Sequence, residues 1–444
     1  MNLSKILFNV TEVPELRKRF LFTMLLLAVY RLGAHIPTPG IDVNALADFF
    51  KRAQGTVFGF MDVFSGGALS KLTIFALGVM PYISSAIIMQ LLTVAIPSIE
   101  KLAKEEGEHG RRKINQYTRY GAVLLAFIQS LGIAIGLESM KTPTGVPVVP
   151  NPGFTFIFVC VTCLTAGATF LMWLGEKITE KGIGNGMSIL IFAGIIASVP
   201  NAVITTFTLF KNGEISLFKL IGIGIIVILM IAAIVYIQEA ERRVPLQYAR
   251  RNIGRQAVGK YTSYLPIKLN PANVIPIIFA ASVLMFPATI AKFVHHPIAQ
   301  AIYDALQPGS TLYLIVYSLL IFFFTYFYTA IIFNPEEIAE NLNKHGGFIP
   351  GVRAGSDTAK YLDRIVSRLT FAGAVFLTLV AVIPILITQN MHLPFYFGGT
   401  AILIVVGVAL DTLRRMEAYA LSISYEGFLG RRKRKRKLGV TTGG

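Results

Sequence analysis

Long apolar runs recur along the whole chain, and they constrain its fold more than any other feature. A bilayer core about 30 Å thick needs roughly 20 apolar residues per helical span. With 54% hydrophobic and only 15% charged residues, the repeated runs predict an all-α polytopic membrane protein with ten transmembrane helices. The predicted spans lie near residues 20–36, 72–96, 116–137, 153–174, 185–205, 217–237, 270–292, 311–333, 366–388 and 396–413.

Lysine and arginine are divided unequally between the two sets of connecting segments. The N-terminus, every second loop and the tail from Arg414 together hold 31 of them, whereas the other loops hold 5. The positive-inside rule therefore places the basic set, and with it both termini, in the cytoplasm. An even number of spans is required by that topology, and ten satisfies it.

A short apolar segment precedes the second run, in a loop that this topology places outside. Residues 56–64 would form only about 14 Å of helix, which is too short to cross the membrane. Ser65, Gly66 and Gly67 follow with a permissive backbone, and Asp62 argues against exposure to lipid. We therefore predict a short re-entrant helix over about residues 56–66, with Ser65-Gly66-Gly67 as a hinge before the second span.

Five spans lie on each side of the loop 238–269. A unit with an odd number of spans returns in the opposite orientation when it is repeated, and inverted repeats commonly hold a pathway at their interface. The sequence thus predicts two inverted, pseudo-symmetric halves. The expected parts are a cytoplasmic amphipathic N-terminus (1–19), a first half (20–205), a second half (206–413) with cytoplasmic docking loops 238–269 and 334–365, and a basic cytoplasmic tail (414–444).

Several classes of chemistry find little support in the sequence. The span interiors carry Ser, Thr, Asn and Gln but no ionisable residue near the midplane, which disfavours the main alternative, a small-molecule secondary transporter. An intramembrane protease would need GxSG, HExxH or paired aspartates. Cys160 and Cys163 lie within a span without a basic neighbour, which favours packing residues, and the six histidines lack metal-ligand spacing. We expect no enzyme activity, cofactor or metal.

Six segments, in order, closely resemble the bacterial SecY family, the channel subunits of the Sec protein translocase. They are FSGGALS with FALGVMPYISSAIIMQLL, GEHGRRKINQYTRYG, FLMWLGEKITEKGIGNGMSILIFAGI, NVIPIIFAASVLMFPATI, FNPEEIAENLNKHGGFIPGVRAGSDTAKYL and PFYFGGTAILIVVGVALD. The likeness runs from about Phe20 to Tyr425. It implies a passive channel with an hourglass pore, a plug helix after the first span, and a lateral gate that releases transmembrane segments into lipid.

The resemblance also implies three groups of site residues. The pore ring would be Val79, Ile83, Met187, Ile191, Ile278 and Ile404; the plug would contain Phe60, Met61, Asp62, Phe64, Ser65, Gly66 and Gly67; the lateral gate would contain Ser84, Gln90, Gln129, Asn273 and Phe286. The first four ring residues form two pairs four positions apart, so each pair shares a helix face. An aliphatic collar excludes ions by dewetting. Ordinary core packing is the alternative explanation for these residues.

The family's partners would dock on the cytoplasmic loops. The resemblance assigns this role to Arg250, Arg251, Arg255 and Arg353, which would contact the SecA ATPase or the ribosome; solvated anchoring loops are the alternative. The chain has no Walker motif, so a partner must supply the energy. The resemblance further implies SecE and SecG subunits, preproteins with signal sequences as substrates, and the bacterial inner membrane. The RRKRKRK tail could bind the ribosome, anionic lipid or nothing specific.

Overall fold

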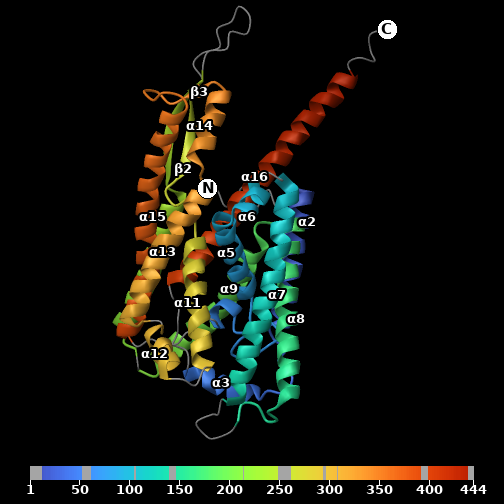
Figure 1. Ribbon diagram of the computed structural model, residues 1–444, viewed down its shortest axis with the longest axis vertical. Coiled ribbons are helices and arrows are strands. Elements are labelled where there is room, and N and C mark those ends of the chain that lie inside the picture. The colour runs from blue at the N-terminus through green and yellow to red at the C-terminus, as the bar shows by residue number, and fades with distance from the viewer. Residues whose placement is uncertain are drawn as a thin grey trace, which may run out of the picture. The chain divides into compact units, whose positions relative to one another are not determined.

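The computed structural model is predominantly helical (Figure 1). It describes residues 13–52, 62–104, 107–139, 147–213, 215–248, 262–293, 297–307, 309–391 and 399–438. Contacts within the chain divide it into two compact units, which are described separately. Unit 1 comprises Met1–Ala53, Phe58–Asn201 and Val408–Gly444, and unit 2 comprises Gln54–Val57 and Ala202–Gly407.

Helices occupy all ten predicted spans, which confirms the all-α membrane fold. In chain order they are α2 (Pro14–Gly33), α5 (Met80–Ala95), α7 (Gly107–Ser139), α8 (Phe154–Lys181), α9 (Gly186–Lys211), α10 (Leu217–Glu239), α11 (Ile275–Phe293), α13 (Thr311–Ile332), α15 (Ser356–Met391) and α16 (Gly399–Leu438). Among the described residues, six helices are long and apolar enough to cross a membrane, and α5 and α11 contribute shorter apolar helices.

The predicted start of the second span at residue 72 is wrong. The helix α5 begins at Met80, and the residues before it form consecutive turns. Leu72 and Gly78 have positive φ angles of 38° and 57°, which a continuous right-handed helix cannot contain. Hydropathy could not reveal this break, because the turn residues are as apolar as the helix that follows.

In unit 1, α8 lies beside α2 and α7, and α5 packs against α7 (Figure 1). Two hydroxyl contacts join these helices. Ser85 donates a hydrogen bond of 2.7 Å to the carbonyl oxygen of Thr118, and the hydroxyls of Ser130 and Thr165 lie 3.0 Å apart. Small residues at such seams allow apolar helices to approach closely, and hydroxyl groups form hydrogen bonds across the seam.

The C-terminal helix α16 begins in unit 2 and belongs to unit 1 from Val408 onward. Its Met416 and Ala420 form a buried cluster with Leu16 and Ile183. Arg19 of α2 donates to the hydroxyl of Tyr419, and its guanidinium lies 4.7 Å from the centre of that ring. The helix extends without a break to Leu438, so the polybasic stretch is helical rather than an irregular tail.

Unit 2 combines helices with a small antiparallel sheet. The strands β1 (Glu241–Tyr248), β2 (Thr262–Lys268) and β3 (Gly347–Phe348) lie in the order β2-β1-β3. One face buries Val244, Leu246 and Ile267 in a core shared with α15. Helix α13 packs between α11 and α15, and α14 packs on α15 and β3 (Figure 1). The two predicted docking loops therefore fold together rather than projecting independently.

Short helices and caps complete the architecture. The short helices are α3 (Val43–Arg52), α6 (Pro97–Lys104), α12 (Pro297–Ala305) and α14 (Pro335–Lys344). Asn334 caps α14 by accepting hydrogen bonds from the amides of Glu336 and Glu337, and Pro335 starts the helix without needing a donor. Ser216 and Ser310 cap α10 and α13 in the same way. These polar residues explain where helices begin within an apolar chain.

Candidate functional site

The predicted plug ends in a compact segment of residues 62–70, here called the plug base, in which residues 62–65 are helical and residues 66–70 turn. Asp62 closes the turn from both sides: its side chain accepts a 2.7 Å hydrogen bond from the amide of Ser70, and its carbonyl accepts one from Gly67. The hydroxyl of Ser65 accepts from the amide of Leu69 at 3.1 Å. The predicted hinge thus lies inside a turn with its own hydrogen bonds. Phe60 and Met61, also assigned to the plug, lie outside the described residues.

Two consecutive residues near the end of α2 hold the plug base. The Tyr30 hydroxyl, which is buried, donates a 3.2 Å hydrogen bond to the carbonyl of Ser65. The Arg31 guanidinium donates a 3.0 Å hydrogen bond to the carbonyl of Gly66. Both carbonyls belong to a turn that has no helical or strand partner for them, so α2 satisfies groups that would otherwise be costly to bury.

Two glycine positions show which segments of unit 1 contact the plug base, and at Gly66 the approach is too close for any side chain. A Cβ atom on Gly66 would lie 2.8 Å from the Cα atom of Gly194 in α9, and one on Gly78 would lie 3.8 Å from the Cα atom of Ser65. Gly78 directly precedes Val79, and Gly194 follows Ile191 by about one helical turn. The plug base therefore lies between the two chain segments that carry Val79 and Ile191.

The turns between the plug base and α5 are buried against helices. The Phe75 ring stacks between Tyr30 of α2 and Phe170 of α8, with centroid distances of 6.1 and 5.9 Å. Gly167 of α8 leaves the space that the carbonyl of Ile74 occupies. Irregular backbone at membrane depth is tolerated where protein covers it. This segment therefore anchors the plug base to unit 1.

The four predicted ring residues of unit 1 are buried, with exposed fractions from 3% for Ile191 to 8% for Met187. Val79 is the N-cap residue of α5, and its carbonyl accepts a hydrogen bond from the amide of Ile83. Along α9, Met187 precedes Gly194 by about 10 Å of helix. On α5, Val79 is therefore nearer to the plug base than Ile83, and on α9, Ile191 is nearer than Met187.

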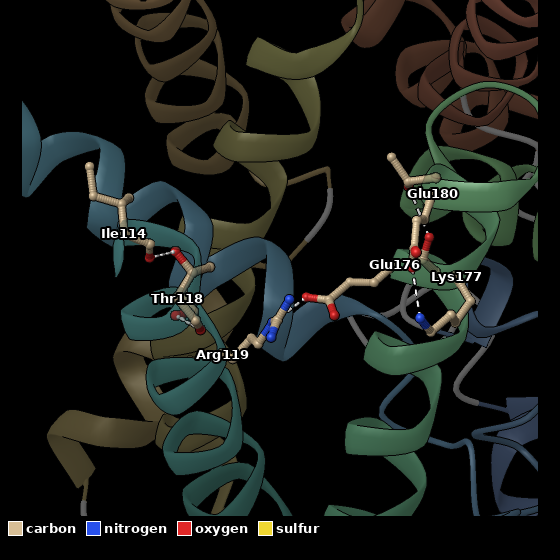
Figure 2. Close-up of polar contacts among 9 residues, drawn as sticks. Ile114, Thr118, Arg119, Glu176, Lys177 and Glu180 are labelled. Atoms are coloured by element: carbon tan, nitrogen blue, oxygen red, sulfur yellow. Dashed lines mark hydrogen bonds and ion pairs between the residues drawn. The ribbon is translucent and has the colours of Figure 1, made fainter. Parts of the chain in front are cut away.

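A pocket of about 540 Å³ lies beside the first turns of α5 and α9. Its lining includes Tyr82, Trp173, Asn185, Met187 and the charged side chains of α7 and α8. Figure 2 shows Arg119 of α7 and Glu176 of α8 pointing toward one another, with the guanidinium Nε 2.6 Å from the carboxylate Oε1. This end of α8 is the one that the positive-inside rule predicts to face the cytoplasm. In unit 1, the ring positions therefore lie close to both a pocket with charged side chains and the plug base, and Met187 itself lines the pocket.

In unit 2, the other two predicted ring residues lie on separate helices. Ile278 of α11 is 7% exposed, and Ile404 of α16 is fully buried. The hydroxyl of Ser282, one turn after Ile278, donates to the Ile278 carbonyl and so presents no free donor there. These two positions share the aliphatic, buried character of the four in unit 1.

Comparison with known proteins identifies the family. The profile of the SecY family matches residues 73–413, which is well over half of the chain. The chain belongs to the SecY family. The protein translocase subunit SecY of Aquifex aeolicus is 54% identical over 429 residues, covering 97% of this chain and all of that protein. The SecY subunit of Escherichia coli K12 is 46% identical over 419 residues and covers 94% of each chain.

Solved structures share the SecY fold at lower identity. One described as a protein-conducting channel has a TM-score of 0.63 at 17% identity, covering 91% of this chain and 92% of that one. The Sec61 channel in a canine ribosome complex from the endoplasmic reticulum has a TM-score of 0.60 at 18% identity, with the same coverage. Another SecY structure, whose plug domain is described as stabilising the closed channel, has a TM-score of 0.64 and 18% identity. The ten helices that occupy the predicted spans of this chain agree with this fold.

The SecY-type lateral gate was assigned to residues on three helices, and the structure describes four of the five. Ser84 and Gln90 lie on α5, and Gln129 lies on α7, all partly buried. Asn273 lies in the turn before α11, two residues ahead of its start, with a φ angle of 57°, a conformation that asparagine tolerates better than most residues. Phe286 lies within α11, but its side chain is outside the described residues.

The SecY-type docking residues are only partly described. Arg250, Arg251 and Arg255 lie outside the described residues. Arg353 is exposed between β3 and α15, and its carbonyl accepts a 2.7 Å hydrogen bond from the hydroxyl of Thr358. On the neighbouring α14, a hydrogen bond from Lys344 holds the pKa of Glu340 below its usual range. The hydrogen bond from Thr358 thus fixes the backbone at Arg353, while the Arg353 side chain is exposed to solvent.

Sequence reasoning missed the residues that hold the plug base. Tyr30, Arg31 and Gly194 come from two helices remote from the plug in sequence. One signal was available for Arg31, because an arginine at the outer end of a span departs from the positive-inside pattern. Nothing in the sequence pointed to Gly194, which is one of many glycines within apolar spans.

Proposed function

We propose that the chain is the protein-conducting channel of the general secretory pathway, moving unfolded polypeptides across the membrane. The observation that carries this proposal is the position of the plug base between the segments bearing Val79 and Ile191. A stopper tied beside an aliphatic constriction fits a pore that rests closed and opens for a bulky, flexible substrate. The SecY family membership and the fold support the same function.

The proposed pore ring consists of Val79, Ile83, Met187, Ile191, Ile278 and Ile404. All six side chains are aliphatic or thioether and buried. Such a collar disfavours water and ions, yet it can spread around a polypeptide without binding a particular sequence. Met187 is unbranched and adaptable, which suits a seal that must re-form around different chains.

A lateral gate would release transmembrane segments into lipid between the second and seventh spans. Ser84, Gln90, Gln129, Asn273 and Phe286 are the proposed gate residues, on the strength of the family resemblance. Polar side chains at a helix seam weaken apolar contact and add only modest hydrogen bonds. A disulfide between cysteines at Ser84 and Phe286 should stop export until a reductant is added. Normal export with that bond fully formed would refute this gate.

The driving force would come from a partner on the cytoplasmic side. We assign docking of the SecA motor or the ribosome to Arg250, Arg251, Arg255 and Arg353, with SecE and SecG as further subunits. The basic loops and the absence of a Walker motif from the sequence support an external source of energy. The proposed location is the bacterial inner membrane, with both termini in the cytoplasm.

Crosslinking to a stalled secretory chain tests the pore. Single cysteines at Val79 and Ile191 should each form an adduct with a cysteine-reactive probe carried by the stalled chain. Ile196 on the same helix is the matched control, because it is 42% exposed and lies beyond the ring. Adducts at Ile196 alone, or at none of the three sites, would contradict the pore assignment.

A further inference from the structure

The plug base is held by contacts that differ in kind from those within it. Its internal hydrogen bonds join residues at most eight positions apart. Tyr30 and Arg31, in contrast, reach it from α2 across 35 positions. The α2 contacts tie the turn to a helix remote in sequence, and once they are lost the local bonds alone protect the turn less well from water. Any displacement of the plug base from unit 1 must break both α2 contacts.

We propose that Tyr30 and Arg31 form a latch that keeps the plug base seated against α9. The latch acts on backbone carbonyls, so it does not depend on the side chains of the plug. Arg31 supplies the stronger contact, because a charged donor roughly doubles the strength of a hydrogen bond. Tyr30 is buried and also stacks on Phe75, which fixes its ring where the hydroxyl meets the carbonyl of Ser65.

The backbone contact between the plug base and Gly194 of α9 is here called the seat. A Cβ atom on Gly194 would lie 2.9 Å from the carbonyl oxygen of Phe64 and 3.1 Å from the hydroxyl of Tyr30. Any side chain there would push against both the plug base and the latch. The seat and the latch therefore work together: α9 limits how deep the turn can sit, and α2 keeps it from leaving.

Only the functional consequence rests on the proposed function. If the plug closes a channel, releasing the latch favours the open state. The seating itself is a property of the folded chain and can be measured without transport. Tyr30 and Arg31 are thus positioning residues that touch no translocating chain in the seated state.

Hydrogen–deuterium exchange on the purified, lipid-reconstituted protein measures the seating directly. In Arg31→Gln and Tyr30→Phe variants, the amides of Gly67, Leu69 and Ser70 should exchange about tenfold faster, the factor expected from losing one net hydrogen bond. Amides of α8 should be unchanged. The matched control is Arg17→Gln, which removes the same charge from an exposed position of the same helix. Arg31→Lys should restore part of the protection, because lysine keeps the charge but not the guanidinium geometry.

Resting ion flux through the same proteoliposomes separates the inference from the function. Faster exchange together with increased ion flux supports both the latch and the plugged channel. Faster exchange with unchanged ion flux supports the latch and overturns the plug's role as a seal. Unchanged exchange at residues 67–70 in both variants overturns the latch, whatever the flux. Gly194→Ala tests the seat by adding an atom instead of removing a bond, and unchanged exchange there would refute the seat.

Discussion

Gly66 and Gly194 meet backbone to backbone, and a Cβ atom on Gly66 would lie 2.8 Å from the Cα atom of Gly194. This contact joins the plug base to α9 without any side chain. It requires glycine for two separate reasons at Gly66, the positive φ angle of 68° and the lack of space. The adjacent Gly67 has a similar φ angle of 82° but open space around it. Gly67 therefore serves as a control that has the positive φ angle of Gly66 without its close contact.

Alanine substitutions at the two glycines should differ in cost. Both Gly66→Ala and Gly67→Ala place a side chain in the left-handed region, at roughly 1–2 kcal/mol. Gly66→Ala should lose about 1–3 kcal/mol more, because its methyl group would overpack the contact with Gly194. Denaturant unfolding in detergent measures the two free energies. Equal losses would show that the close approach to Gly194 adds no constraint.

The ion pair across α7 and α8 should be coupled. Arg119→Gln and Glu176→Gln each remove one partner, and the double variant removes both. A double-mutant cycle on the free energy of unfolding should give a coupling of up to about 1 kcal/mol, discounted because Arg119 is 49% exposed, and weaker at high salt. Glu108 and Arg112, 3.7 Å apart and almost fully exposed, form the control pair and should give none. Equal coupling in both cycles would contradict a special role for the first.

Removing the stopper should make the resting protein leak. Deletion of residues 56–61 leaves Asp62, whose carboxylate closes the plug base by accepting from Ser70. We therefore expect a folded channel with a higher resting ion conductance in planar bilayers. Deletion of residues 56–64 should leak more and also lower stability, since it removes Asp62. Resting conductance equal to that of the intact protein in both deletions would show that this segment does not seal the pore.

Charge reversal at Arg353 should impair partner binding without unfolding the loop. The surrounding backbone is fixed by the hydrogen bond from Thr358 to the Arg353 carbonyl, which Arg353→Glu retains. We expect unchanged thermal stability and at least a tenfold loss of affinity for SecA or the ribosome, with a flatter dependence on salt. Lys360→Glu, on an exposed position of α15, is the control. Equal losses for both variants would indicate a general charge effect.

Much of the fold could be predicted because its signals are local along the chain. Each span is about 20 apolar residues, and each orientation follows from nearby lysines and arginines, so both can be read without knowing any contact. The short segment before α5 was predicted from its length and its glycines, and its residues 56–61 lie outside the described residues. The start of α5 was not, since turn residues 72–79 are as apolar as a helix.

The sequence alone determined a membrane-spanning helical protein and the residue types at the proposed constriction, and it predicts the course of the chain through the bilayer. Only the tertiary structure decided where the plug base sits, which carbonyls Tyr30 and Arg31 satisfy, and why Gly194 must lack a side chain. The physical reason is that hydropathy and charge act residue by residue. A latch, in contrast, exists only where helices remote in sequence bring a donor, a carbonyl and an empty space to one point.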